Sequence, residues 1–173
     1  MIRETLVIQA QAGDKRAFQS LYEEVYEDMY RMAYYLLQNK EDAEDAVSEA
    51  VFDMYRSIAG LRKRDAFKAW AMKILSVKCK LKMREYSYRR GDEAINNDYA
   101  DTLNMEHQVV QRTDIMRALK LLKKEEQIIV VCSAIAGMSS DEVGSITGLK
   151  SATVRTKLRR ALAKMKSRLE AGV

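Results

Sequence analysis

Apolar residues recur at the three- and four-residue spacing of amphipathic helices along most of this chain. The clearest case is residues 15–37, where one helical face would carry Phe18, Leu21, Tyr22, Val25, Met29, Met32, Ala33 and Leu36. The same periodicity predicts helices over about 39–58, 66–86, 113–122 and 124–136. The chain contains no proline, and the two-residue alternation of strands is rare. The pattern therefore predicts an all-α protein.

Several helix ends are marked by residues that favour them. Asp14 and Asn39 each stand where they can accept hydrogen bonds from the first free amides of a helix. Asp65 and Thr113 are placed to cap two further helices in the same way, and Gly60 closes the second helix.

The hydrophobic pattern lapses over residues 89–112, where Asn, Asp and Gly accumulate. This composition predicts an interdomain linker that is mobile in the free protein. We therefore expect two small helical domains, residues 1–88 and residues 113–173, joined by this segment.

Residues 139–168 read as two helices joined by a tight turn. Ser139 followed by Glu142 forms a capping-box pattern, and Gly148 suits a helix end that needs a positive φ. Ser151 is placed to cap the second helix, whose apolar residues are Val154, Leu158, Ala161, Leu162, Met165 and Leu169. A glycine-containing turn before a cationic helix is the arrangement of a helix-turn-helix DNA-binding motif.

The second of these helices has the side chains expected of a helix that binds DNA. No acidic residue occurs between Val143 and Leu169. Hydroxyl and cationic groups gather in its first three turns, and such groups bind base edges and phosphates. The candidate contacts are Ser151, Thr153, Arg155, Thr156, Lys157, Arg159 and Arg160. A solvated amphipathic helix is the alternative, but the turn and the caps favour DNA binding.

Charge is unevenly distributed along the 173 residues. The net charge is +5, and 47% of the residues are hydrophobic, which fits a folded, soluble protein with a polyanionic partner. Acidic residues concentrate in 23–53, whereas basic residues concentrate in 78–90 and 150–168. We expect one acidic surface and two basic surfaces.

The sequence gives little support for a membrane protein, a metal-binding protein or an enzyme. No apolar run reaches 18 residues and the N-terminus lacks a signal-peptide core, which predicts a cytoplasmic chain without stable membrane insertion. Cys79, Cys132 and His107 have no metal-binding spacing, so no metal site is expected. We expect the two thiols to be buried and reduced, a redox switch being the alternative. No catalytic constellation or Gly-rich phosphate loop is present, so we expect neither enzymatic activity nor a cofactor.

Four ordered segments resemble the sigma-70 family of bacterial transcription initiation factors, in the compact group called extracytoplasmic-function sigma factors. Residues 42–49, DAEDAVSE, are similar to the family's DAEDLVQE segment. Residues 13–18, GDKRAF, are similar to its GDxxAF opening, and 67–74 to its FxxWLxxI helix. Residues 152–161, ATVRTKLRRA, are similar to its GTVKSRLxRA recognition helix. The resemblance covers nearly the whole chain.

The resemblance implies that the acidic helix docks on core RNA polymerase, at the clamp helices of the β′ subunit, with further contact to the β subunit. The implied polymerase-binding residues are Asp42, Glu44, Asp45, Ser48 and Glu49. Like charges crowded on one helix are relieved by a basic partner surface. The preference of helix N-termini for acidic residues explains residues 41–45 but not the acids farther along.

The resemblance also implies two contacts with promoter DNA. In the family, the loop at 62–67 captures a base flipped from the minus-ten element, and the following helix lines the path of the single strand. The corresponding cationic residues are Arg62, Lys63, Arg64, Lys73, Lys78 and Lys80. The helix after the glycine turn would read the minus-thirty-five duplex.

This chain departs from the family pattern at several positions. Ser48 stands where Gln is frequent, Val51 where Phe is usual, and Val77 where Asn is frequent. Leu122 replaces a usual Pro, and Ala152 replaces a usual Gly. The promoter sequence therefore does not follow from the resemblance.

The sequence thus predicts an alternative sigma factor that directs promoter-specific transcription initiation. The alternative is a stand-alone helix-turn-helix regulator whose N-terminal domain senses a ligand or dimerises. The resemblance further implies an anti-sigma factor, often anchored in the membrane, that masks the polymerase-binding surfaces until a signal releases them.

Overall fold

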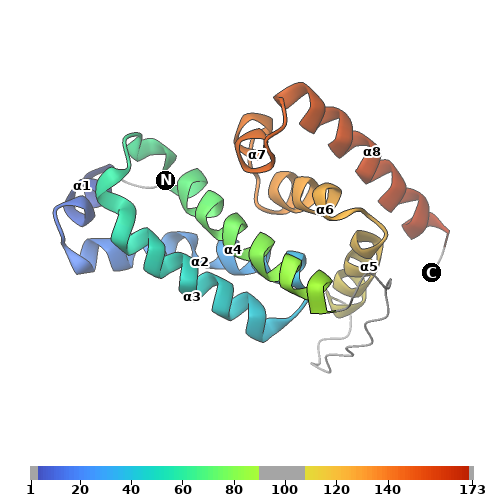
Figure 1. Ribbon diagram of the computed structural model, residues 1–173, viewed down its shortest axis with the longest axis horizontal. Helices are drawn as coiled ribbons and strands as arrows, with labels where there is room; N and C mark the ends of the chain where they lie inside the picture. The colour runs from blue at the N-terminus through green and yellow to red at the C-terminus, as the bar shows by residue number, and fades with distance from the viewer. Residues whose placement is uncertain (1–3, 90–107, 172–173) are drawn as a thin grey trace.

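A computed structural model describes residues 4–89 and 108–171 of the chain, and every regular element in those residues is helical (Figure 1). This confirms the predicted all-α fold. Most of the predicted linker, residues 90–107, lies outside the described residues. We call residues 4–89 the N-terminal module and residues 108–171 the C-terminal module.

The N-terminal module is built around three long helices. A short helix α1 (Glu4–Gln11) precedes α2 (Lys15–Leu37), α3 (Lys40–Ser57) and α4 (Phe67–Arg89), with two 3₁₀ turns, η1 (Ile58–Gly60) and η2 (Arg64–Ala66), between α3 and α4. Helices α2, α3 and α4 pack on one another in pairs. Their apolar faces form a core whose largest fully buried side chains include Leu21, Met29, Met54, Phe67 and Leu75.

The C-terminal module has four helices. They are α5 (Gln108–Lys120), α6 (Lys124–Val130), α7 (Ser140–Thr147) and α8 (Ser151–Glu170). Helix α8 packs against the other three. The single helix predicted over 124–136 is α6 followed by the π-helical turn η3 (Val131–Ile135), a wider coil that shifts the positions of the side chains beyond it.

The structure confirms two of the predicted caps and corrects two others. The carboxylate of Asp14 accepts a hydrogen bond from the amide of Arg16 at 2.8 Å, and Asn39 accepts one from Asp42 at 2.9 Å. Asp65 instead lies inside the 3₁₀ turn η2 and makes no cap bond. Thr113 lies inside α5, which begins at residue 108 within the predicted linker, because upstream helix-forming residues extend that helix.

The two modules pack directly against each other. Elements α2 and α4 of the N-terminal module contact η3 and α7 of the C-terminal module, and the hydrophobic core continues across this contact. We call this contact the joint. The two cysteines are free and fully buried, as predicted, with Cys79 on α4 and Cys132 on η3.

Candidate polymerase and nucleic-acid interfaces

Helices α7 and α8 form the predicted helix-turn-helix. Ser139 Oγ accepts a hydrogen bond from the amide of Glu142 at 3.2 Å, while the Ser139 amide donates to the Glu142 carboxylate at 2.7 Å. Gly148 ends α7 with a φ of 77°, in the left-handed region that favours glycine. The turn is tight, because a Cβ added at Gly144 would lie 2.6 Å from the carbonyl oxygen of Leu149.

The start of α8 differs from the prediction. Lys150 occupies the N-cap position without a side-chain bond, and Ser151 is the first residue of the helix rather than its cap. The Ser151 hydroxyl donates a hydrogen bond to the carboxylate of Asp141 on α7. Ser151 therefore ties the two helices of the motif together.

Most of the predicted DNA contacts lie on the outer face of α8. Figure 1 shows α8 on the side of the C-terminal module away from α4. Val154, Ala161 and Met165 face the core. The exposed side chains of the predicted set are Thr153, Arg155, Thr156, Arg159 and Arg160. A cationic face is thereby available over the first three turns of the helix.

Lys157 is the exception in this set. Its side chain is half-buried, and its ammonium forms an ion pair with the carboxylate of Glu125 on α6. The helical period explains this difference, because Lys157 lies between the outer face and the buried positions Val154 and Ala161. A second pair, Lys164 with Glu126 at 2.7 Å, fastens α8 to α6 farther along. The hydrogen bond from this lysine is the largest cause of the lowered pKa of that glutamate.

The acidic helix α3 turns one flank toward lysines of α4. Lys78 Nζ lies 2.7 Å from a carboxylate oxygen of Asp53. Lys82 Nζ lies 3.9–4.0 Å from carboxylate oxygens of Asp42, Asp45 and Glu49. The crowded negative charge is therefore relieved in part within the module, and not only by an external basic partner as predicted.

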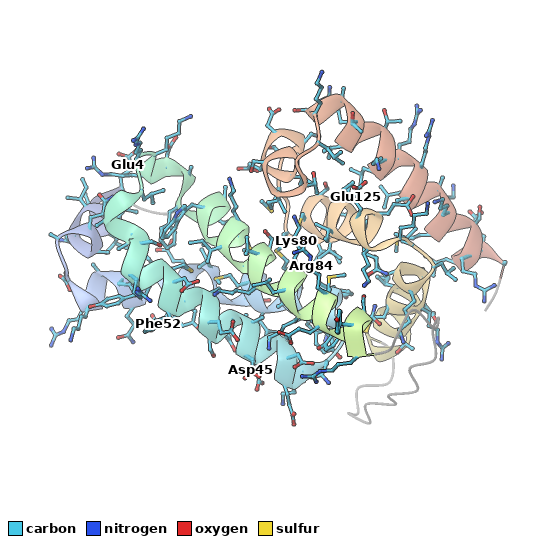
Figure 2. All side chains as sticks on the ribbon, viewed as in Figure 1. Glu4, Asp45, Phe52, Lys80, Arg84 and Glu125 are labelled. Carbon is cyan, nitrogen blue, oxygen red and sulfur yellow. The ribbon has the colours of Figure 1, made fainter. Side chains whose placement is uncertain are left out.

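The other flank of α3 has no such compensation. Glu44 and Ser48 are exposed and make no side-chain bond to the described part of the chain. Phe52 follows at the same helical spacing with 61% of its surface exposed, and Tyr55 is 43% exposed. Figure 2 shows Phe52 and Asp45 at the outer edge of α3. The Arg56 guanidinium lies over the Phe52 ring, 5.5 Å from its centroid.

These two aromatic residues were missed from sequence. Helix α3 buries Ala43, Ala46, Val47, Ala50 and Met54. Phe52 and Tyr55 fall outside that stripe, among charged positions, and this mismatch is the signal that could have identified them. Together with Glu44 and Ser48 they form what we call the open flank of α3.

The predicted minus-ten residues have different surroundings. Arg62, Lys63 and Lys73 are exposed and make no side-chain bond within the described residues. Arg64 is also exposed, and its Nε donates to the Gln11 side-chain oxygen at 3.1 Å, which ties the η2 turn to α1. Arg62, Lys63 and Lys73 are therefore open to a ligand.

Lys78 and Lys80 are already bonded. Lys78 belongs to the α3–α4 ion pairs described above. The Lys80 ammonium donates a hydrogen bond to the carbonyl oxygen of Ile146, near the end of α7. These two lysines lie on different sides of α4, so the predicted cationic track is not continuous in this packing.

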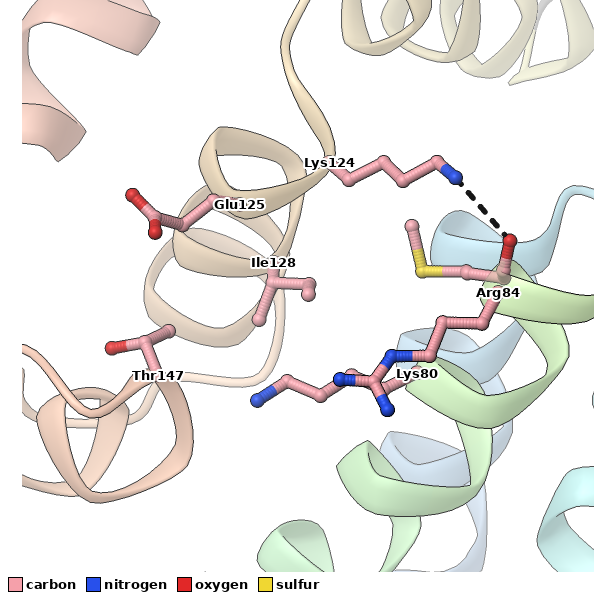
Figure 3. Close-up of a pocket in the computed structure, with 7 residues that line it drawn as sticks. Lys80, Arg84, Lys124, Glu125, Ile128 and Thr147 are labelled. Carbon is pink, nitrogen blue, oxygen red and sulfur yellow. Dashed lines mark hydrogen bonds between the residues drawn. The ribbon is translucent and has the colours of Figure 1, made fainter. Parts of the chain in front are cut away.

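A cavity of about 230 Å³ lies at the joint. Lys80, Met83 and Arg84 of α4 line one side, and the opposite side is formed by Lys124, Glu125, Ile128 and Thr147. Figure 3 shows the side chains of Lys80 and Lys124 crossing toward the opposite module. Lys124 Nζ donates to the Met83 carbonyl oxygen at 3.4 Å.

Within the described residues, no group of His, Cys, Asp and Glu side chains could hold a metal ion. No helix in the same residues is long and apolar enough to cross a membrane.

Comparison with known proteins identifies both modules. The family model for sigma-70 region 2 matches residues 21–87, and the model for sigma-70 region 4 matches residues 112–165. Among curated proteins, the chain is 27% identical over 154 residues to the ECF RNA polymerase sigma factor SigM of Mycobacterium tuberculosis, covering 89% of this chain and 78% of that protein. It is 29% identical over 145 residues to the RNA polymerase sigma factor SigV of Bacillus subtilis, covering 83% and 85%.

Solved structures share the fold over all or most of the chain. The structure of CnrH in complex with the cytosolic domain of CnrY superposes with a TM-score of 0.76 at 22% identity, covering all of both chains. The sigma factor RpoE of Bartonella quintana, in complex with the anti-sigma factor NepR, gives a TM-score of 0.70 at 19% identity, covering 90% of this chain and 98% of that one. With regions 2 and 4 matched in order, this chain belongs to the sigma-70 family of RNA polymerase sigma factors, in the extracytoplasmic-function group.

Proposed function

We propose that this sigma factor binds core polymerase through the open flank of α3 and contacts promoter DNA through residues 62–73 and α8. As a member of its family, the protein is an alternative sigma factor that directs promoter-specific transcription initiation. The observation that carries the proposal is the ordered match of regions 2 and 4 to two modules that each carry an exposed cationic surface, the first of them also carrying the acidic helix α3. A stand-alone regulator is not favoured, because the N-terminal module matches a sigma region.

The open flank suits a protein partner better than the flank that faces α4. Exposed aromatic side chains supply most of the binding energy at protein interfaces, whereas compensated charges add little. Phe52 and Tyr55 provide such anchors beside Glu44 and Ser48. Asp42, Asp45 and Glu49 lie at the edge of this surface, where they add electrostatic steering toward a basic partner.

The outer face of α8 contacts the minus-thirty-five duplex. Arg155, Arg159 and Arg160 supply contacts to phosphates and guanine edges, and Thr153 adds a hydroxyl. Ser151 and Lys157 act instead by holding α8 against α7 and α6.

The exposed cations of residues 62–73 contact the minus-ten strand. Arg62 and Lys63 directly precede the η2 turn, and Lys73 lies two turns into α4. Cations spaced along a path suit a single-stranded phosphate backbone. Lys78 and Lys80 contribute only after leaving their present partners.

The proposal extends to partners and location. The domains responsible are residues 1–88, the region 2-like part, and residues 113–173, the region 4-like part, joined by 89–112. An anti-sigma factor regulates the chain, as the partners of CnrH and RpoE in their solved complexes suggest. The protein works in the cytoplasm, where polymerase and the chromosome are, and acts by binding, without catalysis of its own.

Reconstitution with core polymerase tests this function directly. The chain is expected to co-elute with bacterial core polymerase and to direct initiation at discrete sites on genomic fragments, mapped by sequencing RNA 5′ ends. At physiological salt, fragments carrying those sites are expected to shift on gels only when polymerase is present. If the chain neither binds core polymerase nor redirects its start sites, the proposed function is wrong.

The roles assigned on α8 lead to a second prediction that needs no promoter sequence. Arg159→Gln is expected to lower the salt dependence of nonspecific duplex binding by about 0.9 in the slope of log K against log salt, because one phosphate contact is lost. Lys157→Gln is expected to leave the slope unchanged and to lower the free energy of unfolding by less than about 1 kcal/mol. Fluorescence anisotropy at low salt measures both slopes. Equal slopes for the two variants would contradict the assignment.

A further inference from the structure

Gln11 connects the last turn of α1 to the segment between α3 and α4, residues 58–66, which we call the α3–α4 loop. Its side-chain amide donates two hydrogen bonds, to the carbonyl oxygen of Ile58 at 3.1 Å and to that of Leu61 at 2.8 Å. Its side-chain oxygen accepts a third, from Arg64 Nε at 3.1 Å. One side chain thus bonds three points of the loop, 47 to 53 positions away in the chain.

The chemistry of these three contacts requires an amide. A glutamine side chain carries two N–H donors and one oxygen acceptor on the same planar group, and all three are used here. A carboxylate in its place would have no donor for the two carbonyl oxygens, and an ammonium would have no acceptor for the guanidinium. The two bonds to the carbonyl oxygens are partly buried, so water competes for them less than at an open surface.

Both sides of this contact are anchored in the core of the N-terminal module. Helix α1 buries Val7 and Ala10, and the α3–α4 loop buries Ile58 and Leu61. Helix α1 also contacts both 3₁₀ turns of the loop, η1 and η2, beside which it lies in Figure 1. The side chain of Gln11 therefore extends from a fixed helix to the loop.

The cations of the loop lie directly beside these bonds. Leu61 and Lys63 have extended backbones, and residues 61–63 belong to no helix. Arg62 and Lys63 project from this stretch into solvent. Because Gln11 accepts only from the Nε of Arg64, the N–H groups of the two terminal guanidinium nitrogens remain without a partner in the described residues. A loop that is ordered in advance loses less conformational entropy when it binds a ligand.

We propose that Gln11 is the positioning residue of the α3–α4 loop. Its three bonds hold the loop in one conformation, in which Arg62, Lys63 and the terminal nitrogens of Arg64 meet the phosphates of a single DNA strand together. Gln11 acts through the loop, by lowering the entropy that strand binding costs. The part of this inference that concerns DNA rests on the proposed function of these cations, whereas the positioning is a property of the chain alone.

Hydrogen exchange in the free, full-length chain tests the positioning. Amide exchange in the loop is followed by mass spectrometry, with the Leu61 amide, which bonds the Ile58 carbonyl at 3.0 Å, as one reporter. Gln11→Met keeps the length of the side chain and removes all three bonds, so it is expected to speed exchange about tenfold through local opening. Gln11→Glu removes both donors and is expected to act in the same direction. Circular dichroism verifies that each variant is folded.

Gln9→Met is the matched control for the exchange experiment. Gln9 is a glutamine on the same helix, and its exposed side chain makes no bond to the described part of the chain. The control should exchange at the wild-type rate. Wild-type exchange in both Gln11 variants would overturn the inference, because the loop would then be held without this side chain.

Strand binding by the reconstituted holoenzyme tests the role in DNA binding. The probes are fluorescent single strands, one from each strand of the region upstream of a mapped start site, and anisotropy is measured over a range of salt. Gln11→Met is expected to weaken binding about tenfold at every salt concentration, with an unchanged slope of log K against log salt, because glutamine carries no charge. Arg62→Gln is expected to lower the slope by about 0.7, because a phosphate contact is lost. Affinity for core polymerase should be that of the wild type in both variants.

The two experiments separate this inference from the function on which it rests. Faster loop exchange with wild-type strand binding would overturn the role in DNA binding, and so would a changed salt slope in Gln11→Met. If the wild-type chain fails reconstitution, the proposed function and the strand role are both rejected. The exchange rates then still decide whether Gln11 positions the loop.

Discussion

Replacing Gly144 with alanine is expected to destabilise the C-terminal module by about 2 kcal/mol. Alanine is favoured over glycine inside a helix by about 1 kcal/mol, so the substitution would stabilise an unconstrained α7. Here the added methyl would lie 2.6 Å from the Leu149 carbonyl oxygen, a backbone atom that cannot rotate away. Forcing an atom into a packed site costs about 1–3 kcal/mol or more. The clash outweighs the gain because relieving it requires the turn before α8 to move.

Thermal unfolding followed by circular dichroism measures this effect, with an expected fall in Tm of roughly 10 °C for a module of this size. Gly60→Ala is the matched control, because a Cβ there would meet no atom within 4 Å. That variant should be neutral or more stable by less than about 1 kcal/mol. The Gly144 variant should also lose duplex binding through α8. An unchanged Tm would show that the turn is looser than the structure indicates.

Replacing Phe52 with alanine is expected to weaken binding of core polymerase by at least tenfold. The ring is 61% exposed, so its removal should change the free energy of unfolding by less than about 0.5 kcal/mol. At an interface, an aromatic anchor of this kind contributes about 2 kcal/mol or more. Titration of fluorescently labelled chain with core polymerase, without DNA, measures the affinity.

Tyr88→Ala serves as the control for Phe52, since Tyr88 is 93% exposed at the other end of the N-terminal module. Its removal should leave the affinity for core polymerase unchanged. Comparing Glu44→Lys with Asp42→Lys separates the two flanks of α3, and the first should weaken binding more. If the Phe52→Ala variant binds core polymerase with wild-type affinity, the docking surface is instead the flank of α3 that faces α4.

Sequence periodicity was most reliable where a local rule decides the outcome. The caps at Asp14 and Asn39, the capping box at Ser139 and the glycine at 148 each depend on contacts within a few residues. The predicted caps at Ser151 and Thr113 were wrong, because the residue type alone does not decide whether a hydroxyl side chain caps a helix. A hydroxyl residue can cap a helix or lie inside it, and contacts with Asp141 or upstream residues determine which occurs.

Local rules did not predict which charged side chains are paired within the protein. Lys78, Lys80 and Lys157 look like the other cations of their segments, yet each is bonded to a residue more than 20 positions away. Phe52 looks like a core residue by type and lies outside. Which long side chains remain available to a partner depends on the helices that pack beside them, and spacing along one helix does not contain that information.

The sequence by itself determined that the chain is all-α, that α7 and α8 form a helix-turn-helix, and that acidic and basic residues concentrate in separate segments of the chain. These features follow from helical periodicity, caps and charge, which act over a few turns. Only the tertiary structure decided that the two modules close on each other, with Lys80 bonded to the end of α7 and both cysteines buried between them. The physical reason is that such a joint depends on surface complementarity between segments far apart in the chain, and each surface alone reads as an ordinary helix face.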